Sequence, residues 1–123
     1  PDHPQLASSN IYADSSVNRY WRLINSGVTF TTFDAVFNFA GGTPVDLDDG
    51  VDPTSIGFLG KRFDGFDWVS IGIGTKTATS TQVTGEPFAA YSSGTFRELA
   101  FGKSLVTTDI YTLLKGAGRL WSS

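Results

Sequence analysis

Cysteine is absent from this chain, and methionine is absent with it. Without a sulfur ligand or a thiol nucleophile, disulfides, structural zinc sites and cysteine catalysis are excluded together. Histidine occurs once, as His3, in a segment that holds two prolines. A catalytic triad would need that segment to fold into a formed pocket, so we assign no catalytic residue and expect the protein not to be an enzyme.

Strong helix formers are also scarce. The chain has two glutamates, Glu86 and Glu98, and four lysines, against 14 glycines, 10 phenylalanines and many threonines and serines. Phe, Val, Ile and Leu occur in alternating runs, which are typical of strands with one buried face. We therefore expect an all-β protein. Nothing in the sequence places two carboxylates at the separation that a glycosidase needs.

Basic residues are few and scattered. The net charge of -3 and the isoelectric point near 4.8 argue against nucleic acid as a partner, because counterion release needs clustered Lys and Arg. No stretch approaches the roughly 20 apolar residues that cross a bilayer, so no membrane insertion is expected. No signal peptide is recognised, so we expect a mature form or an excised module. The composition favours an extracellular or cell-surface location.

Residues 61–69 hold the clearest local signal, an Asp64-Gly65 dipeptide between two apolar runs. This dipeptide predicts a β-hairpin with a two-residue turn, in which Phe63 pairs with Phe66. One face of the hairpin would be core, and the other would be a mixed aromatic and cationic surface. The expected core face is Ile56, Phe58, Val69, Ile71 and Ile73, and the opposite face is Leu59, Lys61, Phe63, Phe66 and Trp68.

Short alternating runs separated by turns predict an antiparallel, immunoglobulin-like β-sandwich of about 6–8 strands, with a closed barrel as the alternative. The expected strands are residues 17–25, 28–40, 55–63, 66–73, 76–84 and 95–101. Within the second of them, Phe33, Ala35, Phe37 and Phe39 would share one face. The sandwich would span residues 17–102, after an N-terminal arm or linker over residues 1–16 and before a C-terminal extension over residues 103–123.

The C-terminal extension is too apolar for a solvated tail. It either packs on its own domain or adds a strand to a neighbouring subunit or module, since extended apolar ends can pair with an exposed sheet edge. The residues expected to serve such an assembly are Leu105, Val106, Ile110, Tyr111, Leu113, Leu114, Leu120 and Trp121.

The acidic loop near residue 50 is the best metal candidate, because Ca²⁺ prefers several carboxylate oxygens from one compact loop. Its candidate ligands are Asp46, Asp48, Asp49 and Asp52. The loop does not match the EF-hand pattern, since glycine stands at positions 50 and 57 where ligands are expected. The alternative is a solvated loop in which these aspartates stabilise turns.

Aromatic residues provide a second binding candidate. Trp68, Phe63 and Phe66, with Lys61 on the same hairpin face and Trp21 on an earlier strand, would offer rings on which sugars stack. The alternative is that these side chains fill the core, since a small sandwich needs its large aromatics there.

Three segments resemble, in order, a repeat module of large secreted and cell-surface, adhesin-like proteins of Bacteroidetes-like bacteria, with the pattern "RYW … YDGsxW". They are residues 17–27, which contain Arg19-Tyr20-Trp21, residues 60–68 and residues 77–85. The resemblance implies an immunoglobulin-like β-sandwich and brings no catalytic residues. The chain departs from the pattern at residues 87–91 and in the C-terminal extension.

From these observations we expect a non-catalytic structural module of an extracellular fibre, filament, adhesin or repeat array. Such a module would assemble with copies of itself or with neighbouring modules. The alternative is a carbohydrate-binding module of a secreted polysaccharide-degrading protein, whose partner would be a glycan.

Overall fold

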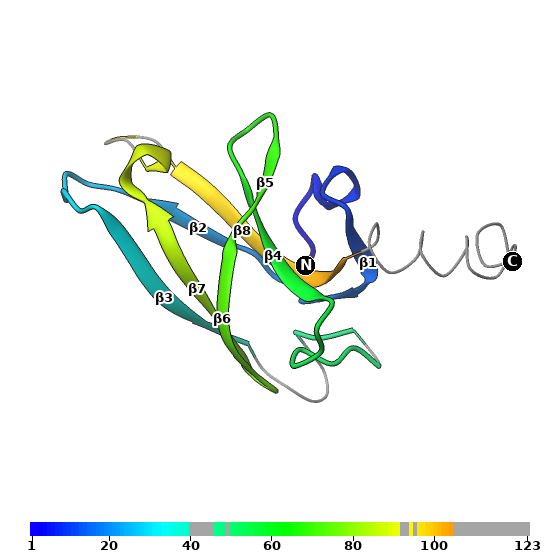
Figure 1. Cartoon of the computed structure of the whole chain (residues 1–123). Coiled ribbons are helices and arrows are strands. Elements are labelled where there is room, and N and C mark those ends of the chain that lie inside the picture. The colour runs from blue at the N-terminus through cyan, green and yellow to red at the C-terminus, as the bar shows by residue number, and fades with distance from the viewer. Residues whose placement is uncertain (40–45, 49, 92–93, 95, 105–123) are drawn as a thin grey trace, which may run out of the picture.

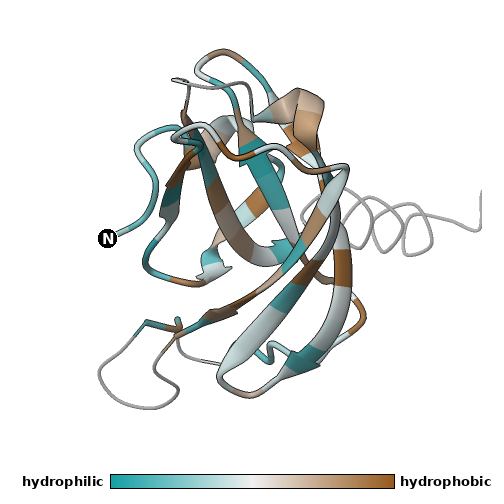
Figure 2. Ribbon diagram, turned by 90° about the vertical axis from the view of Figure 1, so that its left-hand side faces the viewer, coloured by the Kyte–Doolittle hydropathy of each residue, from teal (hydrophilic) through white to brown (hydrophobic). Residues whose placement is uncertain are grey.

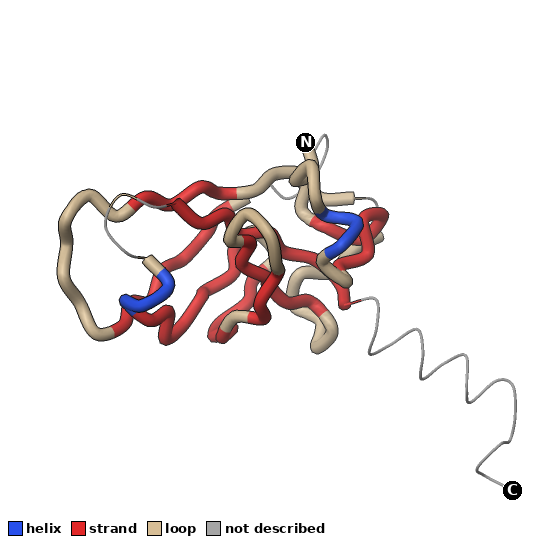
Figure 3. Tube along the Cα trace, turned by 90° about the horizontal axis from the view of Figure 1, so that it is seen from above, coloured by secondary structure: helices blue, strands red, loops and turns tan. Residues whose placement is uncertain are grey.

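The computed structural model describes residues 1–39, 46–48, 50–91, 94 and 96–104. These residues form two antiparallel β-sheets and contain no α-helix (Figure 1), which confirms the expected all-β sandwich class. The strands are β1 (Ile11–Ser16), β2 (Trp21–Ile24), β3 (Thr32–Asn38), β4 (Phe58–Phe63), β5 (Trp68–Ser70), β6 (Gly72–Thr77), β7 (Ser80–Pro87) and β8 (Phe96–Ser104). Two short 3-10 turns, η1 (Leu6–Ser8) and η2 (Phe88–Ala90), lie at opposite ends of the molecule (Figure 3).

Strand β8 organises the larger sheet. The strand order is β1-β8-β4-β5, and β2 pairs with β8 as well. Trp21 of β2 lies opposite Leu99, in the first half of β8, whereas Ile11 of β1 lies opposite Ser104 at its end. The smaller sheet has the order β3-β7-β6. In the larger sheet, β1 and β2 therefore lie on the same side of β8, each along a different part of its length.

Both sheets contribute to the main core. Its buried side chains come from both layers and the loops beside them: Val17, Phe37, Phe39, Phe58, Val83, Leu99 and Phe101. Trp21 packs edge to face against Phe37 and against Phe101, with ring centroids 5.4 Å apart in each pair. The strands carry apolar residues between polar ones (Figure 2), as a two-layer arrangement requires. The expected inward face of β3 agrees with this packing, since Phe37 and Phe39 are buried and Ala35 contacts the core.

The predicted hairpin forms, but its predicted register is wrong by two residues. Phe63 pairs with Trp68 and not with Phe66. The central turn residues are Gly65 and Phe66, and Gly65 has a positive φ of 103°. Asp64 instead accepts the backbone N–H groups of Phe66 and Asp67 on its Oδ1, each at 2.8 Å. An Asp-Gly turn of type I′ needs a positive φ at the aspartate as well as at the glycine. The shifted turn avoids this requirement, and the two hydrogen bonds to the Asp64 carboxylate stabilise it.

The predicted core face of this hairpin is correct in part. Phe58 is buried, and Ile71 and Ile73 pack against the main core. Ile56 is 98 % exposed because it precedes the first paired residue of β4, and Val69 is 45 % exposed because β5 is an edge strand. The predicted strand 66–73 divides at Ile71, where the chain leaves the larger sheet as β5 and enters the smaller one as β6. Such a change of sheet is a known way to build a sandwich corner.

The other predicted strands have different limits too: the segment 28–40 holds β3 over Thr32–Asn38, the segment 55–63 is paired only from Phe58, and the last strand extends to Ser104. The segment 76–84 contains a turn at Ala78 and Thr79 that joins β6 to β7. The segment 17–25 enters the sheet only at Trp21, while Val17 makes a single bridge to Leu47.

The first sixteen residues were expected to form an arm or linker, and here the structure differs. Strand β1 pairs with β8, and Leu6 and Ile11 form a second apolar cluster with Ala100. Tyr20 and Trp68 pack against this cluster. The segment escapes pattern analysis because it is built from a 3-10 turn and an irregular strand, neither of which gives a regular apolar period.

Candidate functional site

The N-terminal segment brings His3 onto the outer face of the larger sheet. The imidazole is 4 % exposed and is surrounded by three rings, which we call the aromatic cage: Tyr20, Phe63 and Trp68. Their centroids lie 4.5, 5.0 and 4.9 Å from that of His3, each in an edge-to-face arrangement. Edge-to-face contacts place positive ring edges against negative ring faces, so the cage stabilises the buried imidazole.

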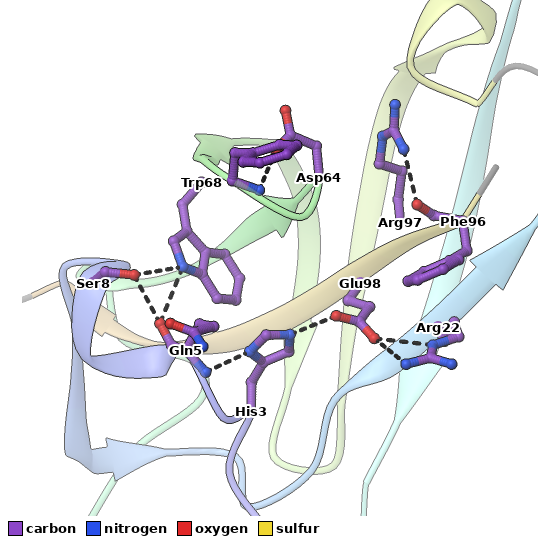
Figure 4. Close-up of polar contacts among 10 residues, drawn as sticks. His3, Gln5, Ser8, Arg22, Asp64, Trp68, Phe96, Arg97 and Glu98 are labelled. Atoms are coloured by element: carbon purple, nitrogen blue, oxygen red, sulfur yellow. Dashed lines mark hydrogen bonds and ion pairs between the residues drawn. The ribbon is translucent and has the colours of Figure 1, made fainter.

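Both ring nitrogens of His3 are engaged (Figure 4). Nδ1 accepts the backbone N–H of Gln5 at 2.9 Å, which places the proton of the neutral ring on Nε2. Nε2 donates to Oε1 of Glu98 at 2.7 Å. His3 thus connects the N-terminal segment to β8 through a buried hydrogen bond.

Glu98 also binds Arg22 from β2. The guanidinium donates to Oε2 through Nε at 2.9 Å and through Nη2 at 2.7 Å. Burial alone would raise the pKa of Glu98, but the hydrogen bonds from His3 and Arg22 outweigh it and hold that pKa below its usual range. The carboxylate therefore stays ionised and joins the N-terminal segment, β8 and β2.

Trp68 is covered by the same segment. Its indole Nε1 donates to the carbonyl oxygen of Gln5 at 3.1 Å and to Oγ of Ser8 at 3.2 Å. Its ring lies 4.8 Å from that of Phe63. The polar edge and one side of the indole are thus already occupied within the chain.

The structure brings together two of the five residues predicted to bind a ligand. Phe63 and Trp68 are neighbours in the aromatic cage. Lys61 lies on the same strand two residues before Phe63, Phe66 is 90 % exposed at the hairpin turn, and Trp21 packs in the main core between the sheets. His3 therefore covers part of the predicted aromatic surface, while the Phe63 and Trp68 rings stay partly exposed.

A second buried ion pair joins the two sheets. Arg62 of β4 donates through Nη1 to both carboxylate oxygens of Glu86 on β7, at 2.7 and 2.8 Å. The Tyr91 hydroxyl donates to Oε1 of the same carboxylate at 2.6 Å. Burial in the first place, and then the contact with Glu86, raise the pKa of Tyr91 well above its usual value. The sequence analysis did not predict this pair, although the chain has only two glutamates and each was therefore a candidate for a specific contact.

The described carboxylates of the acidic loop each bind another group of the protein. Asp46 pairs with Arg19 at 3.1 Å, Asp48 accepts the backbone N–H of Ser16 at 3.0 Å, and Asp52 accepts the N–H and hydroxyl of Thr54. These hydrogen bonds lower the pKa of Asp52. Within the described part of the chain, no group of three or more His, Asp or Glu side chains could hold a metal ion. Asp49 lies outside the described residues, as do the predicted assembly residues of the C-terminal extension.

A cavity of about 350 Å³ opens near the end of the sandwich where η2 lies. It is mostly apolar and is lined by Leu23, Ile24, Asn25, Ser26, Val28, Phe30, Phe33 and Tyr91. Ile24 and Val28 are 61 % and 63 % exposed. No sequence pattern pointed to this cavity, because its walls come from the end of β2, the loop that follows, the beginning of β3 and the residue after η2.

The fold and these contacts define the class of the protein, an all-β sandwich with an aromatic cluster packed around His3 and an apolar cavity at one end. Comparison with protein-family models, with curated protein sequences and with solved structures finds no significant match for this chain. A helix long and apolar enough to cross a membrane is not found in the described residues.

Proposed function

We propose that the chain is a non-catalytic structural module of an extracellular or cell-surface fibre, adhesin or repeat array, with an immunoglobulin-like sandwich. The observation that carries this proposal is the use of the one histidine and the two glutamates of the chain. His3, Glu86 and Glu98 are all buried, and each is held by hydrogen bonds that connect one part of the fold to another. General acid or base catalysis needs a group that can reach a substrate proton, and these three groups are committed to the fold.

The exposed apolar surface supports a role in assembly. Ile24, Val28 and Phe96 are exposed close to the cavity, and Phe96 pairs with Ile24 across β2 and β8. Exposed apolar patches often mark contacts with other proteins. The resemblance of residues 17–27, 60–68 and 77–85 to a repeat module adds independent support for a protein that works as one unit among several.

Molar mass in solution tests this proposal. The full chain is measured by light scattering over a hundredfold range of concentration, next to a chain that ends at Ser104. Growth of the mass of the full chain with concentration, and a constant single-chain mass for the shorter form, would support it. A full chain that stays a monomer throughout would remove the support.

A carbohydrate-binding module is the weaker candidate, because His3 packs against all three rings of the aromatic cage and covers part of each. Replacement of Trp68 by Ala separates the two functions. We expect the free energy of unfolding to fall by about 3 kcal/mol, the lower end for loss of a packed aromatic side chain, since Trp68 is only partly buried. Tryptophan fluorescence of the parent chain during titration with soluble glycans should not change. A saturable change that Trp68→Ala abolishes without loss of stability would favour the carbohydrate-binding function.

A further inference from the structure

The apolar cavity and the last described residue lie at opposite ends of β8. Leu23 and Ile24, which line the cavity, pair with Arg97 and Phe96 at the beginning of that strand. Ser104 ends the same strand beside β1 (Figure 1). Eight steps of about 3.3 Å separate the two ends by roughly 26 Å. The segment that follows Ser104 therefore starts far from the cavity of its own sandwich.

The walls of the cavity favour an apolar occupant. Asn25 uses its whole side chain inside the loop: Nδ2 donates to the carbonyl oxygens of Val28 and Tyr91, and Oδ1 accepts the N–H groups of Gly27 and Val28, at 2.8 to 2.9 Å. The Tyr91 hydroxyl is directed to Glu86. A sugar placed here would leave most of its hydroxyls without partners, which is unfavourable. An aliphatic or aromatic side chain has no hydroxyl groups to leave without partners, so it avoids this cost.

The cavity is also held in shape before any partner arrives. Phe30 packs edge to face on Phe33 and on Phe88, at 5.5 and 5.1 Å, and Phe33 packs on Tyr91 at 5.2 Å. Asn25 fixes the loop that carries Val28. A preformed site does not have to be ordered on binding, so apolar contacts made in it contribute more to affinity.

The chain itself contains a suitable occupant. Residues 105–121 follow Ser104 and include eight large apolar residues, among them the Leu113-Leu114 pair. We propose that the cavity of one copy binds apolar side chains from residues 105–121 of a second copy. This inference rests on the proposed structural function and names its contact. Because the two contacting surfaces are different, a pair of copies keeps one free cavity and one free segment, so further copies can add head to tail into a filament if the rotation between copies does not close a ring.

Cysteine cross-linking tests the contact, since the chain has no cysteine of its own. The full-length variants Val28→Cys and Leu113→Cys are mixed under mild oxidation, with an affinity tag on one of them so that products differ in mass. We expect the mixed dimer to form at least tenfold faster than the mixed dimer of Val36→Cys with Leu113→Cys. Val36 is a matched control because it is a valine of similar exposure, 56 %, that does not line the cavity.

Two results would overturn the proposal. Equal rates for the two pairs would mean that the segment does not select the cavity. A link that forms only within one chain carrying both Val28→Cys and Leu113→Cys would mean that the segment folds back on its own sandwich.

A charge at the mouth of the cavity separates this inference from the proposed function. Val28→Asp should weaken self-association of the full chain at least tenfold, whereas Val36→Asp should leave it unchanged. If the full chain associates and Val28→Asp has no effect, the cavity contact is wrong while the assembly function stands. If the full chain does not associate at all, both are wrong.

Discussion

At the scale of single residues, His3 determines how the outer face of the larger sheet is covered. Its ring fills the aromatic cage, and its Nε2–H binds a buried carboxylate. Replacement by Ala removes both contacts and leaves Oε1 of Glu98 without this donor. We expect the free energy of unfolding to fall by about 2–3 kcal/mol, as measured by urea denaturation. Gln5→Ala is the control, because Gln5 contributes through its backbone, and an equal loss in both variants would contradict the account.

Substitution of Glu86 should lower the stability of the fold more than substitution of Glu98, the other glutamate. Its neutralisation in Glu86→Gln leaves the guanidinium of Arg62, which is 13 % exposed, without its counter-charge inside the sandwich. Breaking a buried ion pair from one side costs about 3 kcal/mol or more, and thermal unfolding should show this loss. Replacing the whole network by Arg62→Leu, Glu86→Leu and Tyr91→Phe should cost less than the single change. A larger loss in the triple variant would show that the ion pair is a net stabiliser.

Glu98 gives the fold a predictable dependence on acid. Because its pKa is lower in the folded state than in the unfolded state, it contributes stability that is complete above the ordinary glutamate pKa. That contribution is lost as the pH falls through the lowered value, when the carboxylate takes up a proton. Unfolding free energies measured in acid should therefore fall less steeply for Glu98→Gln than for the parent chain. Parallel curves would show that Glu98 is not responsible.

At the scale of structural elements, one glycine determines the register of the β4–β5 hairpin. Gly65 has a φ of 103°, a backbone conformation that residues with a Cβ rarely adopt. Gly65→Ala should lower the unfolding free energy by about 1 kcal/mol in chemical denaturation. Phe66→Ala in the same turn should change it by no more than about 0.5 kcal/mol, since Phe66 is 90 % exposed. The reverse order of effects would contradict this turn geometry.

Regular alternation made some elements predictable from sequence. The inward face of β3 and the burial of Phe58 follow from a period of two along the chain. The hairpin was also foreseen, but its register was not, because the carboxylate of Asp64 and the φ of Gly65 select between two turns that share the same sequence. The division of β5 from β6 at Ile71 depends on which sheet offers a partner, and local sequence does not contain that information.

At the scale of the whole molecule, the candidate site could be predicted only in outline. The nearness of Phe63 and Trp68 follows from the hairpin, whereas the packing of His3 against both rings does not. His3 and Glu98 are separated by 95 positions, and Arg62 and Glu86 meet across two sheets. Single contacts of this kind leave no periodic trace in sequence. They are nevertheless the contacts that close the outer face and join the layers.

The two ends of the sandwich differ in how far their apolar side chains are covered. His3 and η1 cover the aromatic cage, while the other end carries an apolar cavity with exposed Ile24 and Val28 beside it. This asymmetry is suited to a unit that contacts its neighbours through different surfaces at its two ends.

Electron microscopy of the concentrated full chain is the most direct test of the central claim, that the protein is a passive unit that assembles with copies of itself. The account predicts linear assemblies in which sandwich-sized units repeat in one orientation. Fields that contain only separate single units, at every concentration examined, would contradict it.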